Sequence, residues 1–270
     1  VANLGFVVAP TLGGFLFDWG GFFLPFGASA ICHFVFVVVS CLTPDGARMN
    51  SMREPLLEPE TPEHVSLKDI LHRDTLLLVP AGVLVPAFFG AFDPLIAGHL
   101  CSCLRITDTR TIGSLMALCA YPSVALNVVV PALMTRLRAD TIALVGVLTF
   151  ASVEFGLALT DPDSIGSLGF GMFPEPGSPK QWTCQVSFFL LLGMGAPFVW
   201  SPTLPDIMDK AATHISAQRG VSHEVAVEAV SPAVSALFNG AAAIGEAAGP
   251  ILGGVFYSNF GFCGTFLSMA

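Results

Sequence analysis

The sequence predicts an all-α polytopic membrane protein, and three observations support this fold class. Of its 270 residues, 53% are hydrophobic and only 11% are charged, whereas soluble domains contain about 25% charged residues. Several apolar runs are about 20 residues long, enough for a helix to cross a hydrocarbon core of roughly 30 Å. A glycine-rich pattern also occurs twice, once at the beginning and once near the end of the chain.

The repeated pattern predicts two related halves of a helical bundle. Residues 245–257 repeat the pattern of residues 5–17 at a constant offset of 240. Small residues recur at every fourth position, which gives each helix a stripe that a neighbouring backbone can approach closely. A proline in each copy adds a kink. The helix-packing residues are Gly5, Ala9, Pro10, Gly13 and Gly14 in the first copy, and Gly245, Gly249, Pro250, Gly253 and Gly254 in the second.

This pattern resembles the antiporter motif of the major facilitator superfamily, G-x-x-x-G-P-x-x-G-G, carried on the fifth helix and sometimes echoed on the eleventh. The second copy is complete, whereas the first has Ala9 in place of glycine. The resemblance implies an incomplete superfamily fold: the last two helices of the N-terminal bundle (1–42), a cytoplasmic central loop (43–73), and most of the C-terminal six-helix bundle (74–270). The chain is then a fragment from helix five to the start of helix twelve.

The elements follow in order from the apolar pattern. Helix five ends near Phe17, and residues 22–42 form the next span. Residues 43–73 contain several prolines and ten charged residues, the composition of a solvated linker. Further spans are predicted at 75–99, 112–134, 140–160 and 183–205, with an outer loop at 100–110, a solvated connector at 207–231 and a last complete helix from Pro232.

The distribution of basic residues supports this number of spans. Cytoplasmic loops of membrane proteins are enriched in lysine and arginine. If the 43–73 loop is cytoplasmic, eight basic residues share its side: Arg48, Arg53, Lys68, Arg73, Arg136, Arg138, Lys210 and Arg219. Only Arg105, Arg110 and Lys180 fall on the outer side.

Other functional classes find little support in the sequence. A net charge of −9 argues against a nucleic-acid partner. We find no catalytic set, no phosphate-binding loop and no metal constellation, so we expect neither an enzyme nor a cofactor. Cys101, Cys103 and Cys184 lie near the outer side, where one disulfide could form.

Asp93 is the main candidate for substrate binding. A carboxylate inside an apolar helix costs several kcal/mol unless it faces a partner or a watery cavity; the alternative is a helix-end cap near the outer surface. The segment 88–95, which includes Phe89 and Asp93, resembles helix seven of the vesicular amine transporters and their polyamine-transporting relatives. In that family the corresponding acid helps to recognise the cationic substrate.

Three further acids are candidates for proton coupling. Glu246 lies seven residues after Asn239, so both side chains lie on nearly one helical face; the amine transporters have an acid where Asn239 stands, and we expect Asn239 to contact the substrate. Glu154 is buried by pattern, or else lies near the outer rim within reach of water. Asp206 follows a Pro-x-x-Pro segment similar to that of the polyamine transporters. It belongs either to an inner gate or to a solvated helix end.

The resemblance implies a secondary active transporter that exchanges protons for an organic cation, a monoamine or polyamine, by alternating access. A carboxylate in a low-dielectric cavity holds either a proton or an ammonium, and this competition couples the two flows. We expect a monomer in a vesicular, other organellar or plasma membrane, with the cation, protons and lipid as its partners. The alternatives are a drug-type or other-solute exporter, and a helical receptor or scaffold that transports nothing.

Overall fold

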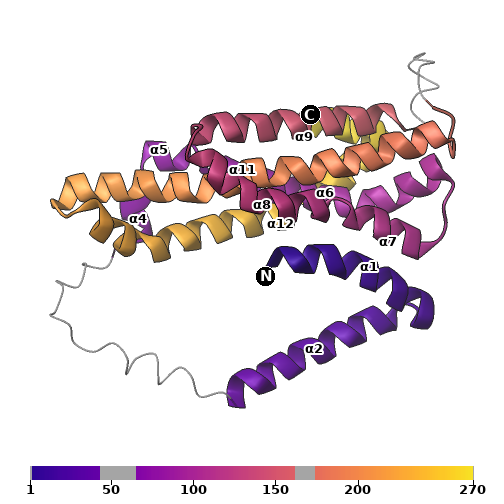
Figure 1. Cartoon of the computed structure of the whole chain (residues 1–270), viewed down its shortest axis with the longest axis horizontal. Coiled ribbons are helices and arrows are strands. Elements are labelled where there is room, and N and C mark those ends of the chain that lie inside the picture. The colour runs from indigo at the N-terminus through magenta and orange to yellow at the C-terminus, as the bar shows by residue number, and fades with distance from the viewer. Residues whose placement is uncertain (1, 43–64, 162–173, 270) are drawn as a thin grey trace.

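The computed structural model describes residues 2–42, 65–161 and 174–269, and within these ranges the ordered elements are helices with no β-strand. The predicted loop 43–73 therefore falls largely outside the described residues. Figure 1 shows the long helices side by side along the longest axis, with α1 and α2 forming a separate hairpin below them. The helices are α1 (Ala2–Gly20), α2 (Phe23–Leu42), α4 (Leu67–Ile70), α5 (Arg73–Leu76), α6 (Val79–Leu104), α7 (Thr109–Ala117), α8 (Ala120–Met134), α9 (Ala139–Leu159), α11 (Pro179–Arg219) and α12 (His223–Met269).

Five helical stretches are long and apolar enough to cross a membrane, so the predicted polytopic membrane fold is confirmed. They comprise Arg73–Leu104, Thr109–Met134, Ala139–Leu159, Pro179–Arg219 and His223–Met269. The α4–α5 segment, the α8–α9 turn and the α11–α12 turn lie at one end of the bundle in Figure 1, and the α1–α2, α6–α7 and α9–α11 connections lie at the other. Successive connections therefore alternate between the two ends of the bundle, as the predicted distribution of basic residues requires.

The predicted connector at 207–231 is wrong, because α11 continues to Arg219 and α12 begins at His223. Gly220 ends α11 in the left-handed conformation with φ 68°, which glycine adopts without a Cβ clash. The extension of α11 is amphipathic: its buried side chains pack with those of α12 in a second hydrophobic cluster. That cluster includes Ile207, Ala211, Ile215, Ala226, Val230 and Val234. Tertiary burial of one face keeps these polar segments helical.

α6 ends later than predicted, and α12 contains a break in its helix. α6 continues to Leu104, so residues 100–104 are helical rather than loop, and Arg105 ends the helix at φ 56°. Cys101 and Cys184 form no disulfide with a described residue, and the Cys103 Sγ donates to the Thr160 carbonyl at 3.2 Å. Within α12 the backbone breaks at Gly261, with φ 67° and ψ −172°. A new helix therefore begins after the second motif copy, as predicted.

Both copies of the small-residue motif lie at close helix crossings. In the second copy, a Cβ added to Gly245 would lie 3.0 Å from the Ala87 backbone nitrogen of α6, and one on Gly253 would lie 2.8 Å from the Ala91 Cβ. In the first copy, a Cβ added to Gly14 would lie 2.8 Å from the Thr109 carbonyl of α7. The second copy thus seats α12 on α6, and the first seats α1 on α7.

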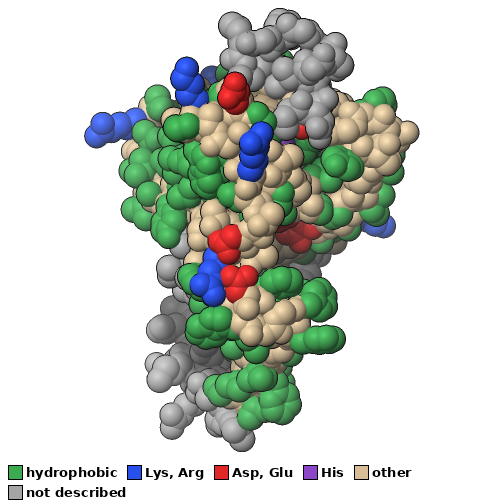
Figure 2. Space-filling model, turned by 90° about the vertical axis from the view of Figure 1, so that its right-hand side faces the viewer, with side chains coloured by type: hydrophobic (Ala, Val, Ile, Leu, Met, Phe, Trp, Pro, Cys, Tyr) green, Lys and Arg blue, Asp and Glu red, His purple; other side chains and the backbone are tan. Residues whose placement is uncertain are grey.

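An ion pair also joins α1 to α7. The Arg110 Nε lies 2.6 Å from the Asp18 carboxylate, which also accepts a hydrogen bond from the Thr109 hydroxyl. Figure 2 looks at this end of the molecule and shows acidic and basic side chains together at the narrow junction between the large bundle and the α1–α2 hairpin.

The core of the bundle is aromatic. Phe88 of α6 makes ring contacts with Phe92, with Phe150 of α9 and with Phe266 near the end of α12, at centroid distances of 5.4, 5.3 and 6.2 Å. Such stacked and edge-to-face pairs add about 0.5–1.5 kcal/mol each beyond the burial of their area. They hold α6, α9 and the end of α12 together, and so position the surface of α6 that carries Asp93.

Candidate transport site

Asp93 lies on α6 on the side opposite to an exposed apolar residue. Leu84 is 64% exposed and lies nine residues earlier. On an ideal helix the two side chains therefore point about 180° apart. The Asp93 side chain is also exposed, and among the described residues it has no hydrogen bond or ion pair. It lies close enough to Cys119, at the α7–α8 junction, to interact with it electrostatically. The carboxylate is therefore open to a ligand on a face other than that of Leu84.

Phe89 lies one helical turn before Asp93 and is half-buried. Its ring packs edge to face against Phe150 of α9, with the centroids 6.1 Å apart, and against Phe88 at 5.5 Å. These contacts fix the ring beside the carboxylate. An aromatic face next to an acid is a suitable environment for an organic cation.

Glu246 and Asn239 share one exposed face of α12. Close to Glu246 this face carries small residues, namely Ala243, Pro250 and Gly254, and further along the helix it carries the exposed Tyr257. The large exposed side chains Ile244 and Ile251 point about 140° to 160° away from Glu246. Around Glu246, α12 therefore has a small and polar face that is separate from the bulky apolar face of Ile244 and Ile251.

Asp93 and Glu246 are brought to adjacent helices. A Cβ added to Gly90 of α6 would lie 3.2 Å from the Glu246 carbonyl and 3.4 Å from the Gly249 Cα. Asp93 lies three residues after Gly90, and Glu246 lies three residues before Gly249. Because α6 and α12 run parallel, the two acids are about 9 Å apart along the helix axes. No contact joins their side chains directly.

Glu154 lies apart from this pair. It is only 6% exposed and stands on α9 between Phe150 and Leu157, both of which belong to the hydrophobic core. Its burial agrees with the prediction from the sequence pattern. No hydrogen bond or ion pair to its carboxylate is found among the described residues.

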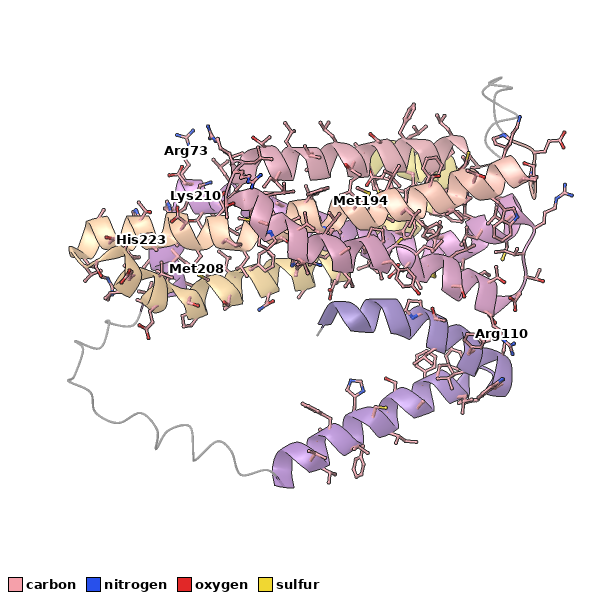
Figure 3. All side chains as sticks on the ribbon, in the orientation of Figure 1. Arg73, Arg110, Met194, Met208, Lys210 and His223 are labelled. Carbon is pink, nitrogen blue, oxygen red and sulfur yellow. The ribbon has the colours of Figure 1, made fainter. Side chains whose placement is uncertain are left out.

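Asp206 lies within α11, so the alternative of a solvated helix end is wrong, and the alternative of an inner gate stays a prediction. Its carboxylate accepts a hydrogen bond from the Lys210 ammonium at 2.8 Å, one helical turn later. Figure 3 shows Lys210 at the same end of the bundle as Arg73, far from Arg110 at the other end. A carboxylate with a lysine counter-ion is a weaker candidate for binding a cation than the unpaired Asp93.

The sequence reasoning missed a buried polar cluster around His99. The His99 ring is stacked on Phe262 at 3.8 Å, and its Nε2 lies 3.1 Å from the Gln185 Nε2 and 3.2 Å from the Cys103 Sγ. Gln185 donates a second hydrogen bond to the Thr160 hydroxyl at 3.1 Å. The signal was available, since histidine is an ionisable residue within an apolar span.

This cluster joins α6, the residue that follows α9, and α11 at the end of the bundle where the α6–α7 and α9–α11 connections lie (Figure 1). Gln181 belongs to it as well, since its side chain donates to the Thr160 carbonyl at 3.3 Å. The side-chain oxygens of Gln181 and Gln185 are buried without a partner among the described atoms. The network is therefore only partly satisfied, and each buried oxygen without a partner costs free energy.

The sequence profile of the Major Facilitator Superfamily matches residues 1–221. The chain belongs to the major facilitator superfamily. Comparisons with curated proteins and with solved structures each give no match. This major facilitator superfamily protein is thus an integral membrane protein of a transporter superfamily, whose members are transporters rather than enzymes.

Proposed function

We propose that this protein exchanges protons for a small organic cation, a monoamine or polyamine, across a vesicular or other cellular membrane. The observation that carries the proposal is the placement of Asp93 and Glu246. They lie on adjacent parallel helices, and each points away from an exposed bulky apolar residue of its own helix. Neither has a counter-ion among the described residues.

In this mechanism Asp93 is the counter-charge for the substrate ammonium, with Phe89 beside it and Asn239 on the same face as Glu246. Glu246 is the main proton site, and Glu154 and Asp206 are secondary sites. A carboxylate in a cavity of low dielectric binds either a proton or an ammonium, so release of one favours binding of the other. Residues 1–42 and 74–270 then belong to two bundles that alternate around the site, with 43–73 as the linker.

Uptake of labelled monoamine or polyamine into proteoliposomes with an imposed pH gradient tests this proposal. Asp93→Asn keeps the size of the side chain and removes its charge, so we expect uptake to fall to the level of protein-free vesicles. Asp209→Asn, at an exposed position on α11, is the matched control and is expected to retain uptake. Wild-type uptake by the Asp93→Asn protein would refute the assignment. Gradient-driven uptake of neutral or anionic solutes, with no amine uptake, would favour an exporter of another solute class.

A further inference from the structure

We propose that a groove between α8 and α9 binds an anionic phospholipid. The groove lies at the end of the bundle that carries the α8–α9 turn, Arg73 and Lys210, here called the basic end (Figure 1 and Figure 3). The two helices are joined by the turn 135–138, but each packs against α11 and they make little contact with each other. A groove with a volume of about 160 Å³ lies between them. It is lined by Leu133, Leu137, Thr141, Ile142, Val145 and Phe198.

The lining of the groove suits a hydrocarbon chain. Its only polar side chain is Thr141, and Phe198 of α11 contributes an aromatic ring. Leu137 and Val145 are 49% and 48% exposed, so the groove opens to its surroundings. A polar metabolite would lose hydrogen bonds to water here without replacing them. An acyl chain has no such cost, and the surrounding bilayer supplies it.

The mouth of the groove carries two arginines. Arg136 and Arg138 flank Leu137 in the turn, and Arg138 lies 2.9 Å from Asp140. This ion pair is highly exposed, with side-chain exposures of 84% and 60%, and such pairs contribute little and are easily replaced. Arg136 has no ion pair with any described residue. The turn therefore presents two guanidinium groups against one carboxylate.

The positive charge of the turn, and its position at the end of the membrane-spanning helices, favour an anionic headgroup. Guanidinium groups bind phosphate through two parallel hydrogen bonds. Figure 3 shows Arg73 and Lys210 at the same end of the molecule, so the basic residues gather on one side of the membrane-spanning helices. Basic residues at this level attract lipids with net negative charge over zwitterionic ones. In this arrangement the first carbons of an acyl chain lie in the groove and the phosphate meets the arginines.

Native mass spectrometry of the full chain tests this site, after release from nanodiscs with equal amounts of phosphatidylglycerol and phosphatidylcholine. We expect the wild type to retain phosphatidylglycerol preferentially. The double variant Arg136→Gln/Arg138→Gln should lower the ratio of bound phosphatidylglycerol to phosphatidylcholine by about tenfold. Arg105→Gln/Lys180→Gln removes the same charge from the opposite end and should leave the ratio unchanged. Val145→Trp fills the groove and should reduce retention of both lipids.

Two results would overturn the site. If both charge variants lose phosphatidylglycerol equally, the preference reflects net charge and not the α8–α9 turn. If Arg136→Gln/Arg138→Gln or Val145→Trp retains lipid as the wild type does, the groove is not the binding place. Circular dichroism of each variant verifies that the helical content is retained, so that loss of lipid is not loss of fold.

Discussion

The Arg110 guanidinium lies 2.6 Å from the Asp18 carboxylate and thereby ties α7 to α1 at the end of the molecule where the α6–α7 connection lies. The same guanidinium lies 5.2 Å from the centre of the Phe15 ring, one helical turn before Asp18. Under the proposed alternating-access mechanism, this charged contact would stabilise the state in which this end is closed.

We expect the Asp18–Arg110 pair to show coupling in a double-mutant cycle. Asp18→Arg and Arg110→Asp each break the pair and should destabilise the protein, whereas the exchanged double variant should recover stability. The coupling free energy is expected to be about 1 kcal/mol, because both side chains remain partly exposed. Denaturant unfolding of the four proteins in detergent measures it, and strictly additive effects would show that the pair contributes nothing.

The glycine stripe of α12 predicts opposite effects for the same substitution at two positions. A Cβ at Gly249 would lie 3.0 Å from the Ala91 backbone nitrogen and still closer to the Ala87 carbonyl, whereas one at Gly254 would meet nothing within 4 Å. Gly249→Ala should therefore cost about 1–3 kcal/mol through overpacking. Gly254→Ala should be neutral or stabilising by up to about 1 kcal/mol. Thermal unfolding in detergent compares them, and equal melting temperatures would contradict the close α6–α12 crossing.

The His99 cluster predicts a stability cost when its central amide is removed. Gln185→Leu deletes the donor to the His99 ring and to the Thr160 hydroxyl, so these buried groups keep only their contacts with the Cys103 Sγ and the Leu157 carbonyl. The expected loss is about 1–3 kcal/mol in the free energy of unfolding. Thr183→Ala is an exposed control on the same helix, and its effect should stay within about 0.5 kcal/mol. A Gln185→Leu protein as stable as this control would show that the cluster does not stabilise the bundle.

Asp108, at the start of α7, predicts a pH dependence outside the membrane spans. Its carboxylate accepts hydrogen bonds from the Thr111 hydroxyl at 2.6 Å and backbone nitrogen at 2.9 Å. Chiefly through these bonds the pKa of Asp108 is lowered from its ordinary value of 3.8. A lowered pKa in the folded state gives stability that is present above 3.8 and is lost as the pH falls through the folded value.

We therefore expect Asp108→Ala to have a lower melting temperature than the wild type at neutral pH. The difference should shrink at pH values well below 3.8, where the wild-type carboxylate is protonated. Melting curves of both proteins across this range provide the measurement. A difference in melting temperature that does not change with pH would mean that Asp108 stabilises the start of α7 without its negative charge.

The candidate site was predictable only in part. Asp93 and Glu246 were identifiable because a carboxylate in an apolar helix is rare and costly. Their placement on adjacent helices was not, since it depends on which partner the Gly245–Gly253 stripe meets, and a small-residue stripe fits many helices equally well. His99 was missed because its importance comes from Gln185, 86 residues later in the chain.

The sequence by itself determined that this is a helical membrane protein with two related copies of one kinked helix, because hydrophobicity, helical period and small-residue spacing are local properties. The extent of α11 and α12 beyond the apolar runs was decided only by the tertiary structure, since burial of Ile207 and Ile215 against α12 keeps a polar segment helical. The tertiary structure also decided which helix each copy of the repeated motif packs against. Similar stripes pack on α7 in one copy and on α6 in the other, and only the surrounding helices determine which surface is close enough to be buried.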